Sequence, residues 1–259
     1  MQIFARNPRQ IRRHSLKKED IDIFRKKLNE TKIHPLVIHT PYTLNLASHK
    51  NFLYRISIKD FTQDIEEAHQ LGAQYIVIHT GSFPGDETEG LERIAKALRL
   101  ILKNTANLST EILLENTSGD GSSLGYIFSH HGLIFRKLRY NRRLGLCLDT
   151  AHAWCAGYRI NTKDGLNSLL DQIDREIGIE RLKVIHLNDT LDELGSRKDR
   201  HFHIGRGKIG EEGFKLVLSH PSLKYLPFIL ETPKTHEDDD MINLSTIRRI
   251  YKDELYQKT

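Results

Sequence analysis

The sequence is poor in cysteine and has no long apolar run. Its 259 residues include two cysteines, Cys147 and Cys155, whose spacing matches no zinc-finger motif and offers no disulfide framework. No apolar run approaches the roughly 18 residues that a membrane span requires. The first residues, MQIFARNPRQIRRH, are charged where a signal peptide would be apolar. These absences predict a reduced, cytoplasmic protein with no membrane partner.

Positive charge is concentrated at the amino-terminal end of the sequence. The formal net charge is +5, and residues 1–32 hold ten Lys or Arg against four Asp or Glu, so the remaining chain carries −1. A second basic run, residues 136–143, contains no acidic residue. Basic clusters suit a polyanionic partner, because Lys and Arg neutralise phosphates. Solvated helix faces and loops explain the same clusters equally well.

Six short apolar runs each stop at a His, Glu or Asp. Runs rich in Val, Ile and Leu without polar alternation are typical of strands buried on both faces of a parallel sheet. When several such strands end in a metal-ligand type of residue, we expect these ends to converge on one site. The six residues are His39 (LVIHT), His79 (YIVIHT), Glu115 (ILLEN), Asp149 (LGLCLD), His186 (KVIHLN) and Glu231 (PFILE).

A seventh strand is predicted at residues 2–5, and helical stretches separate the strands. Apolar stripes at helical spacing predict core-facing helices at residues 61–71, 91–102, 166–177, 244–251 and, less cleanly, 21–28. Strand–helix alternation without a linker predicts one α/β domain over residues 1–259. A doubly wound open sheet is the alternative, but six converging strand ends favour a TIM-type barrel, which normally has eight strands.

Imidazole and carboxylate ligands without cysteine suit zinc or manganese in a hydrolytic or isomerase site. Two loop segments, LDTAHAW and SRKDRHFHIG, add His152, Asp199 and His201. Nine candidate ligands are enough for three metals if one carboxylate bridges two of them. His203 is ambiguous, because it lies two positions from His201. Seven further histidines are predicted on the surface (His49, His69, His130, His131, His220 and His236) or in a structural role (His34).

Four long motifs stand out in the sequence: ENTSGDGSSLG (115–125), LDTAHAWCAGY (148–158), HLNDT with SRKDRHFHIGRGKIG (186–210) and ILETPK (229–234). They closely resemble those of the endonuclease IV family, the zinc-dependent abasic-site endonucleases of base-excision repair. The resemblance extends from the first residues to the C-terminal helix. It implies a TIM barrel of the xylose-isomerase-like superfamily with three zinc ions at its C-terminal face.

Ligand sets and activity follow from that resemblance. It implies cleavage of duplex DNA 5′ to an abasic site, leaving a 3′-hydroxyl, together with removal of 3′ blocking groups. Glu115 and Glu231 would be catalytic, and manganese would also suit the ligands. Arg9 and Tyr42 match family positions that enter the duplex. The implied zinc sets are His39, His79 and Glu115; Glu115, Asp149, His186 and Glu231; and His152, Asp199 and His201.

The sequence departs from the family at its start. By the resemblance it begins at the family's second strand, so we expect the given sequence to lack an opening βα unit of roughly 30 residues. A misplaced start codon or a truncated chain is the preferred explanation, and a genuinely seven-stranded or dimer-completed barrel is the alternative. A monomer is the default expectation. A smaller departure is Arg206, which stands where the family usually carries an acid.

Two rival functions remain open at this stage. A two-metal sugar isomerase or epimerase of the xylose-isomerase-like barrels would use similar ligands, but it has no purpose for His152, Asp199 and His201. The second rival is a non-catalytic DNA-damage binder. Incubation with a duplex that contains one abasic site separates an endonuclease from both rivals.

Overall fold

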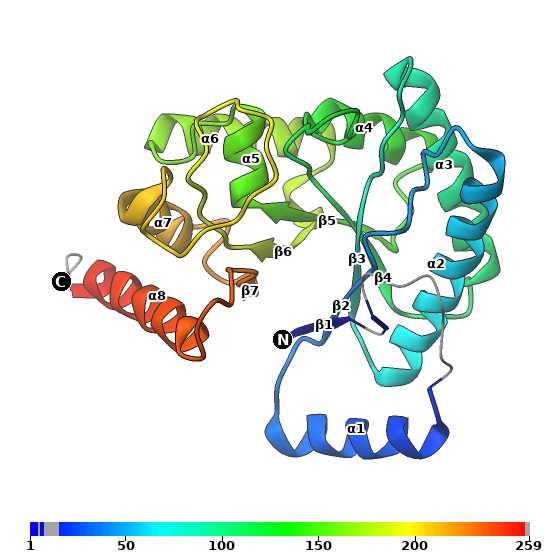
Figure 1. Ribbon diagram of the computed structural model, residues 1–259, viewed down its shortest axis with the longest axis horizontal. Coiled ribbons are helices and arrows are strands. Elements are labelled where there is room, and N and C mark those ends of the chain that lie inside the picture. Colours follow the sequence, from blue (N-terminus) through cyan, green and yellow to red (C-terminus); the bar gives the residue numbers. More distant parts are fainter. Residues whose placement is uncertain (5, 8–15, 257–259) are drawn as a thin grey trace. The chain divides into compact units, whose positions relative to one another are not determined.

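A computed structural model describes residues 1–4, 6, 7 and 16–256 of the chain. The chain forms two compact units, and their helices and strands are labelled in Figure 1. Unit 1 comprises residues 1–115 and 130–146, and unit 2 comprises residues 116–129 and 147–259. Strand β5 (Leu144–Asp149) contributes to both units. That the whole chain acts as one domain stays a prediction.

Unit 1 contains the first four strands, which run parallel and are hydrogen-bonded in chain order. Their middle residues, such as Ile38 and Ile76, are fully buried, as predicted for strands covered on both faces. The register places Phe4 beside His39 and His79 beside Glu115, so the strand ends lie at one edge. The strands are β1 (Gln2–Phe4), β2 (Val37–His39), β3 (Tyr75–His79) and β4 (Glu111–Glu115).

Two helices of unit 1, α2 and α3, bury their predicted apolar stripes. Phe61 and Ile65 of α2 (Asn51–Leu71) are fully buried, as are Ile94 and Leu98 of α3 (Glu87–Asn104). The carboxylate of Asp86 begins α3 by accepting the N–H groups of residues 88 and 89. Helix α2 ends at a glycine with φ 85°, a conformation that costs glycine nothing. Helix α4 (Phe128–Lys137) follows β4.

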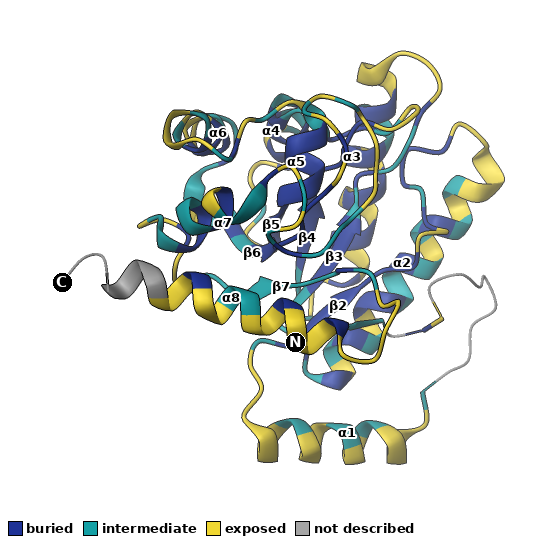
Figure 2. Ribbon diagram, turned by 60° about the vertical axis from the view of Figure 1, so that its left-hand side comes forward, coloured by how far each residue is buried: buried dark blue, intermediate teal, exposed yellow. Residues whose placement is uncertain are grey.

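Helix α1 (Lys18–Thr31) is the exception among these stripes. Its apolar residues Ile21, Phe24 and Leu28 are only half-buried, and no residue of the helix is fully buried. Figure 2 shows exposed and intermediate residues along its whole length. Its packing partner is the neighbouring helix α2, so a narrow stripe suffices. The predicted stripe is thus the inward side of the helix, because its three residues are the least exposed, but it packs on α2 without being fully buried.

Unit 2 holds the second half of β5 and two further parallel strands in chain order. With β1–β4, this makes seven strands in the described part of the chain, as predicted. No helix among the described residues is long and apolar enough to cross a membrane. The remaining elements are β6 (Leu182–His186), β7 (Phe228–Ile229), α5 (Thr150–Ala156), α6 (Lys163–Glu176), a 3₁₀ turn (Ile179–Arg181), α7 (Gly210–Ser219) and α8 (Asp239–Tyr256).

Helix α8 turns inward a face that only partly matches the predicted stripe. Of that stripe, Ile250 is buried and Ile247 is half-buried, whereas Leu244 and Tyr251 are 40% and 43% exposed; Asn243, which the stripe omits, is buried. The Asn243 side chain accepts the N–H of Ile204 at 2.9 Å. A polar side chain with a buried partner therefore occupies the inner face, and a count of apolar residues misses it.

Candidate metal centre

A first cluster of ligand-type side chains lies at the carboxyl ends of three neighbouring strands in unit 1. It consists of His39 on β2, His79 on β3 and Glu115 on β4, whose ligand atoms all lie within 4.8 Å of one another. We call it the Glu115 cluster. Oε2 of Glu115 is 3.1 Å from Nε2 of His39 and 3.1 Å from Nε2 of His79. The strand register pairs His79 with Glu115 directly, whereas His39 pairs with Val77 and reaches the cluster from the end of the neighbouring strand.

The donor chemistry of the Glu115 cluster fits a divalent metal. Glu115 is fully buried, and a buried carboxylate is costly unless it is paired or coordinates an ion. Nδ1 of His39 lies 2.8 Å from the carbonyl oxygen of Thr40, so Nε2 of His39 faces the carboxylate. A ligating imidazole is commonly oriented in this way by a carbonyl on its other nitrogen. Two imidazole nitrogens and one carboxylate match a zinc donor set.

An exposed aromatic ring stands beside the Glu115 cluster. Tyr42 is 63% exposed, and its ring centroid lies 6.1 Å from that of His39 and 6.3 Å from that of His79. The ring centroid of Phe4 lies 5.9 Å from that of Tyr42. Tyr42 is therefore positioned to meet a molecule that enters the site. Arg9, the other predicted DNA contact, lies outside the described residues.

A second cluster lies in unit 2, and we call it the Asp149 cluster. It contains Asp149, His152 and His201, whose ligand atoms lie within 4.8 Å of one another, together with Asp199. Nε2 of His152 is 3.0 Å from Oδ1 of Asp199 and 3.4 Å from Nε2 of His201. Two imidazole nitrogens that face each other beside carboxylates repel one another when both carry protons. A shared cation removes that conflict, so this set also fits a metal.

Helix α5 explains the position of His152. The Asp149 carboxylate accepts the N–H of His152 at 2.7 Å and thereby caps the amino end of the helix. Nδ1 of His152 faces the carbonyl oxygen of Asn116 at 3.0 Å. One aspartate thus ends a strand, begins a helix and presents its second oxygen, Oδ2, 3.6 Å from Nε2 of His201.

His186 and Glu231 form a third contact in unit 2. Nδ1 of His186, which is fully buried, lies 3.1 Å from Oε2 of Glu231. Glu231 is half-buried and follows β7 by two residues. Its carboxylate therefore reaches both a buried imidazole and the solvent.

Two buried asparagines orient the ligands, and sequence reasoning missed them. The Asn188 amide donates to Oδ2 of Asp149 at 2.6 Å, and its oxygen accepts the N–H of Glu231 at 2.8 Å. The Asn116 side chain bonds the backbone of Asp149 in both directions, at 2.7 and 3.1 Å. Each asparagine follows a predicted ligand by one or two residues, in ILLEN and KVIHLN, and that spacing was the available signal.

The nine predicted ligands divide between the two units. Three form the Glu115 cluster, and the other six lie in unit 2. The expected sharing of Glu115 between two ions stays a prediction. His203, left open by the sequence, lies 3.1 Å from the Asn243 amide through Nδ1 and so packs against α8.

Two of the remaining histidines contradict the prediction of a surface position. His130 and His131 on α4 are 6% and 0% exposed. Nε2 of His130 lies 3.3 Å from a Glu87 carboxylate oxygen, and burial lowers the pKa of its imidazole. The inner face of α4 takes both side chains, because FSHHGLIF places them among its apolar residues. The other four, His49, His69, His220 and His236, are exposed or half-buried, as predicted.

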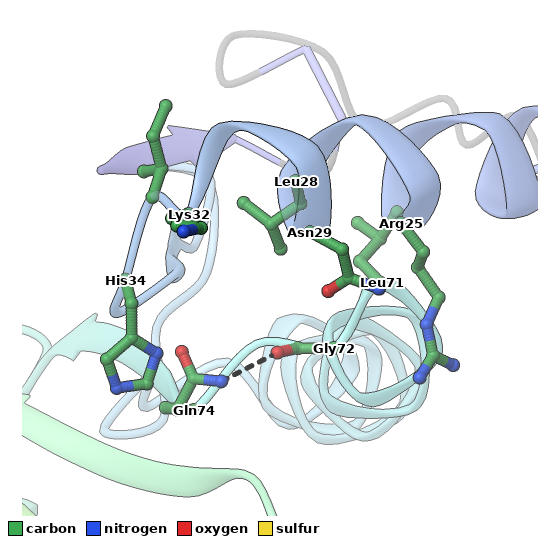
Figure 3. A pocket seen from close by; sticks show the side chains of 9 residues that line it. Arg25, Leu28, Asn29, Lys32, His34, Leu71, Gly72 and Gln74 are labelled. Carbon is green, nitrogen blue, oxygen red and sulfur yellow. Dashed lines mark hydrogen bonds between the residues drawn. The ribbon is translucent and has the colours of Figure 1, made fainter.

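A pocket of unit 1 lies at the opposite ends of these strands. It is lined by α1 and by the segment after α2, including Arg25, His34 and Gln74 (Figure 3). Gln74 stands just before β3, whereas the ligand His79 ends that strand. The Gln74 side chain donates to the carbonyl oxygen of Gly72 at 3.0 Å and accepts the N–H of Leu36 at 2.7 Å. This pocket is therefore separate from the Glu115 cluster, and the Gln74 side chain in its lining is bonded to the backbone.

Comparisons with known proteins agree with this picture. The family model described as a xylose isomerase-like TIM barrel matches residues 1–252. The parallel strands with ligand-type residues at their carboxyl ends are those of a protein of this class. A probable endonuclease 4 of Chloroflexus aggregans is 41% identical over 254 residues, covering 97% of this chain and 89% of the relative. The crystal structure of endonuclease IV from Thermus thermophilus matches with a TM-score of 0.86 at 36% identity, over 97% of this chain and 88% of that one. The chain belongs to the endonuclease IV family.

A likeness to sugar-modifying proteins extends to the fold alone. The structure of a D-tagatose 3-epimerase-like protein matches with a TM-score of 0.69 at 20% identity, over 92% of this chain and 86% of that one. At this identity the fold is shared and the activity is not implied.

Proposed function

We propose that the protein is a metal-dependent endonuclease that cleaves duplex DNA at abasic sites. It would hydrolyse the phosphodiester 5′ to the abasic sugar and leave a 3′-hydroxyl. The observation that carries the proposal is the position of Glu115, fully buried with the Nε2 atoms of two histidines at 3.1 Å from one carboxylate oxygen. Membership of the endonuclease IV family supports the same activity.

The proposed cofactor is zinc, with three ions per chain, and manganese suits the same ligands. His39, His79 and Glu115 would hold the first ion. Glu115 would also join Asp149, His186 and Glu231 around the second, an assignment that rests on the family resemblance. His152, Asp199 and His201 would hold the third. Zinc, when bound, supplies a Lewis acid that lowers the pKa of water and neutralises phosphate charge.

The protein's own side chains would provide positioning and proton transfer. Glu115 is fully buried, so we assign it to holding the imidazoles of His39 and His79 in place and not to exchanging protons with solvent. Glu231 is partly exposed and touches His186, so we assign it to taking up the proton of the attacking water. Asn188 fixes the orientation of that region through Asp149 Oδ2 and the Glu231 N–H.

Recognition of the damage is assigned to the exposed ring of Tyr42 and to Arg9. An aromatic wedge costs a few kcal/mol of unstacking, least where a base is already missing, and so favours abasic sites. Removal of 3′ blocking groups would use the same centre, since it also breaks a phosphate ester. We propose that the active species is a monomer.

A duplex with a single synthetic abasic site tests the proposal. The wild-type protein should cut once, 5′ to the site, and leave an end that a DNA polymerase extends. Glu115→Gln should abolish the cut. The amide keeps one acceptor oxygen but replaces the other with an NH2 donor, and it carries no negative charge. Glu111→Gln is the matched control, because Glu111 begins the same strand that Glu115 ends, and it should cut as the wild type does.

The same assay separates the rival functions. Tight binding of the abasic duplex without a cut, at saturating zinc, would favour a DNA-damage binder. Two bound ions per chain without any cut would favour a sugar isomerase or epimerase. Three ions found by elemental analysis, together with a cut that chelation abolishes, would agree with the proposal.

A further inference from the structure

The loop between β6 and α7 carries two of the proposed ligands of the third ion. It runs through residues 187–209 and contains Asp199 and His201. Asp199 is exposed, so the loop cannot owe its shape to burial of that side chain. Something else must fix a segment of this length, because ordering each residue costs roughly 1–2 kcal/mol of backbone entropy.

The carboxylate of Asp189 joins the start of this loop to its end. Oδ1 of Asp189 accepts the N–H of Thr190 at 2.8 Å and that of Ile209 at 3.1 Å. Oδ2 accepts the N–H of Gly207 at 2.9 Å. The side chain is fully buried. Burial raises the pKa of Asp189, while the N–H groups of Gly207, Thr190 and Ile209 act in the opposite direction.

The backbone of Asp189 holds the middle of the loop as well. Its carbonyl oxygen accepts the N–H of Phe202 at 2.7 Å, and the two residues form an isolated antiparallel bridge. Phe202 directly follows His201. The carbonyl oxygen of Thr190 accepts the N–H of Lys208 at 2.7 Å, which closes the same end again. Asp189, which joins the two ends of the loop, is thus also bonded to the residue next to the proposed ligand His201.

Gly207 shows how tightly the loop end approaches Asp189. A Cβ atom at this position would lie 2.3 Å from the carbonyl oxygen of Thr190 and 2.4 Å from Oδ1 of Asp189. Neither distance can be met without moving backbone or carboxylate. A glycine is therefore required for Asp189 to receive the N–H of residue 207.

We infer that Asp189 is a positioning residue for the third metal site, holding Asp199 and His201 against His152 by closing the 187–209 loop. The inference rests on the proposed function, because it assigns a purpose to a metal set that the proposal contains. Asp189 itself is no ligand, since its carboxylate oxygens are taken up by the backbone N–H groups of residues 190, 207 and 209.

Asp189→Asn is the direct test. The amide keeps one acceptor oxygen and turns an N–H donor toward backbone N–H groups, so at least one tie is lost. When zinc is titrated into the metal-free protein, we expect one ion to bind about 10- to 100-fold more weakly, as for other residues that orient ligands. The remaining ions should bind as in the wild type, and high zinc should restore incision. A general loss of stability would instead weaken all ions together.

Gly207→Ala perturbs the same contact from the other side and should weaken the same ion. Glu193→Gln is the control within the loop, because the exposed Glu193 side chain pairs with Lys208 on the surface. If Asp189→Asn does not fold by circular dichroism, Gly207→Ala decides the matter. Wild-type affinity for every ion in both variants would overturn the inference.

Amide hydrogen exchange of the metal-free protein separates this inference from the proposed function. Amides of residues 199–203 should lose protection in Asp189→Asn and keep it in Glu193→Gln. If the wild type binds no metal and makes no cut, the proposed function fails, and unchanged protection would then refute the loop closure independently. If the wild type binds three ions and cuts, a variant that binds them equally well refutes the inference alone.

Discussion

Asn116 and Asp149 are bonded side chain to backbone in both directions. Oδ1 of Asn116 accepts the N–H of Asp149 at 2.7 Å, and its amide donates to the carbonyl oxygen of Asp149 at 3.1 Å. Both residues are buried. The end of β5 is therefore fixed where Asp149 turns its carboxylate to His152 and His201.

Asn116→Ala should destabilise the protein and loosen the Asp149 cluster. The substitution leaves a buried N–H and a buried carbonyl without their partner, at roughly 1–3 kcal/mol each, so we expect the free energy of unfolding to fall by about 2–6 kcal/mol. Urea denaturation in the presence of a chelator measures it. Asn167→Ala is the control, because Asn167 makes one half-buried bond to His220. An equal effect of the two substitutions would contradict the prediction.

Metal removal should lower the melting temperature. An ion that binds only the folded state adds about 2.7 kcal/mol at a concentration of 100 times its Kd. The stabilisation should rise with zinc concentration and vanish with a chelator. His79→Ala removes one member of the Glu115 cluster and should show a smaller zinc-dependent rise in melting temperature than the control Glu111→Gln. Glu111 begins β4, at the end of the strand opposite Glu115. A melting temperature independent of zinc would count against any metal at these clusters.

The strand-end ligands could be predicted because a parallel sheet fixes where its carboxyl ends lie. One rule about buried strands therefore placed His39, His79 and Glu115 side by side. The orienting residues could not be found in this way, because the side chains of Asn188 and Asp189 each make several hydrogen bonds whose partners depend on loop paths. A loop path depends on contacts remote in sequence, which no local period records.

Helix faces show the same limit from the apolar side. The period placed the stripes of α2 and α3 well, because large aliphatic side chains had no competitor for the core. It was only partly right on α8, where Asn243 shares the inner face with Ile250, and it gave no sign that His131 of α4 is fully buried. Polar residues with buried partners are invisible to a pattern that counts only apolar positions.

The second basic run contains one structural member. Arg143 is buried, and its guanidinium donates to the carbonyl oxygens of Thr105 and Thr110, with Nη2 2.9 Å from the latter. Arg143→Lys should lower the free energy of unfolding by roughly 2–4 kcal/mol, because an ammonium cannot reproduce the fork of donors. Thermal and urea denaturation measure this. Arg142→Lys, on the exposed neighbour, should change little, and equal losses would argue against the structural role.

Tyr42→Ala should reduce discrimination between damaged and intact DNA. Without the ring, we expect the ratio of affinities for abasic and intact duplexes to fall about tenfold, which is ~1.4 kcal/mol. Glu115→Gln in the background prevents cleavage during the binding measurement. Tyr42→Phe should keep most of the ratio, because it keeps the ring. Tyr225→Ala removes another exposed tyrosine, 85% exposed, and serves as the control. A ratio for Tyr42→Ala equal to that control would refute the role.

Acid should remove a stabilising contribution of Asp239 at the start of α8. Oδ2 of Asp239 accepts the N–H groups of His236 and Thr235, each at 2.7 Å. The bond from the His236 N–H, more than any other contact, lowers the pKa of Asp239 to about 2, against 3.8 for an ordinary aspartate. Because the native pKa is depressed, the contribution is present above pH 3.8 and is lost as the pH falls through about 2.

Asp239→Asn should therefore melt below the wild type at pH 7, and the gap should narrow between pH 4 and pH 2. Melting in the presence of a chelator, across that range, measures the gap while other carboxylates titrate equally in both proteins. Asp240→Asn is the neighbouring control, since Asp240 makes a surface ion pair with Lys234 at 2.6 Å and exposed pairs contribute little. A gap for Asp239→Asn that stays constant down to pH 2 would contradict the assignment, because the hydrogen-bonded carboxylate is the group that acid must protonate.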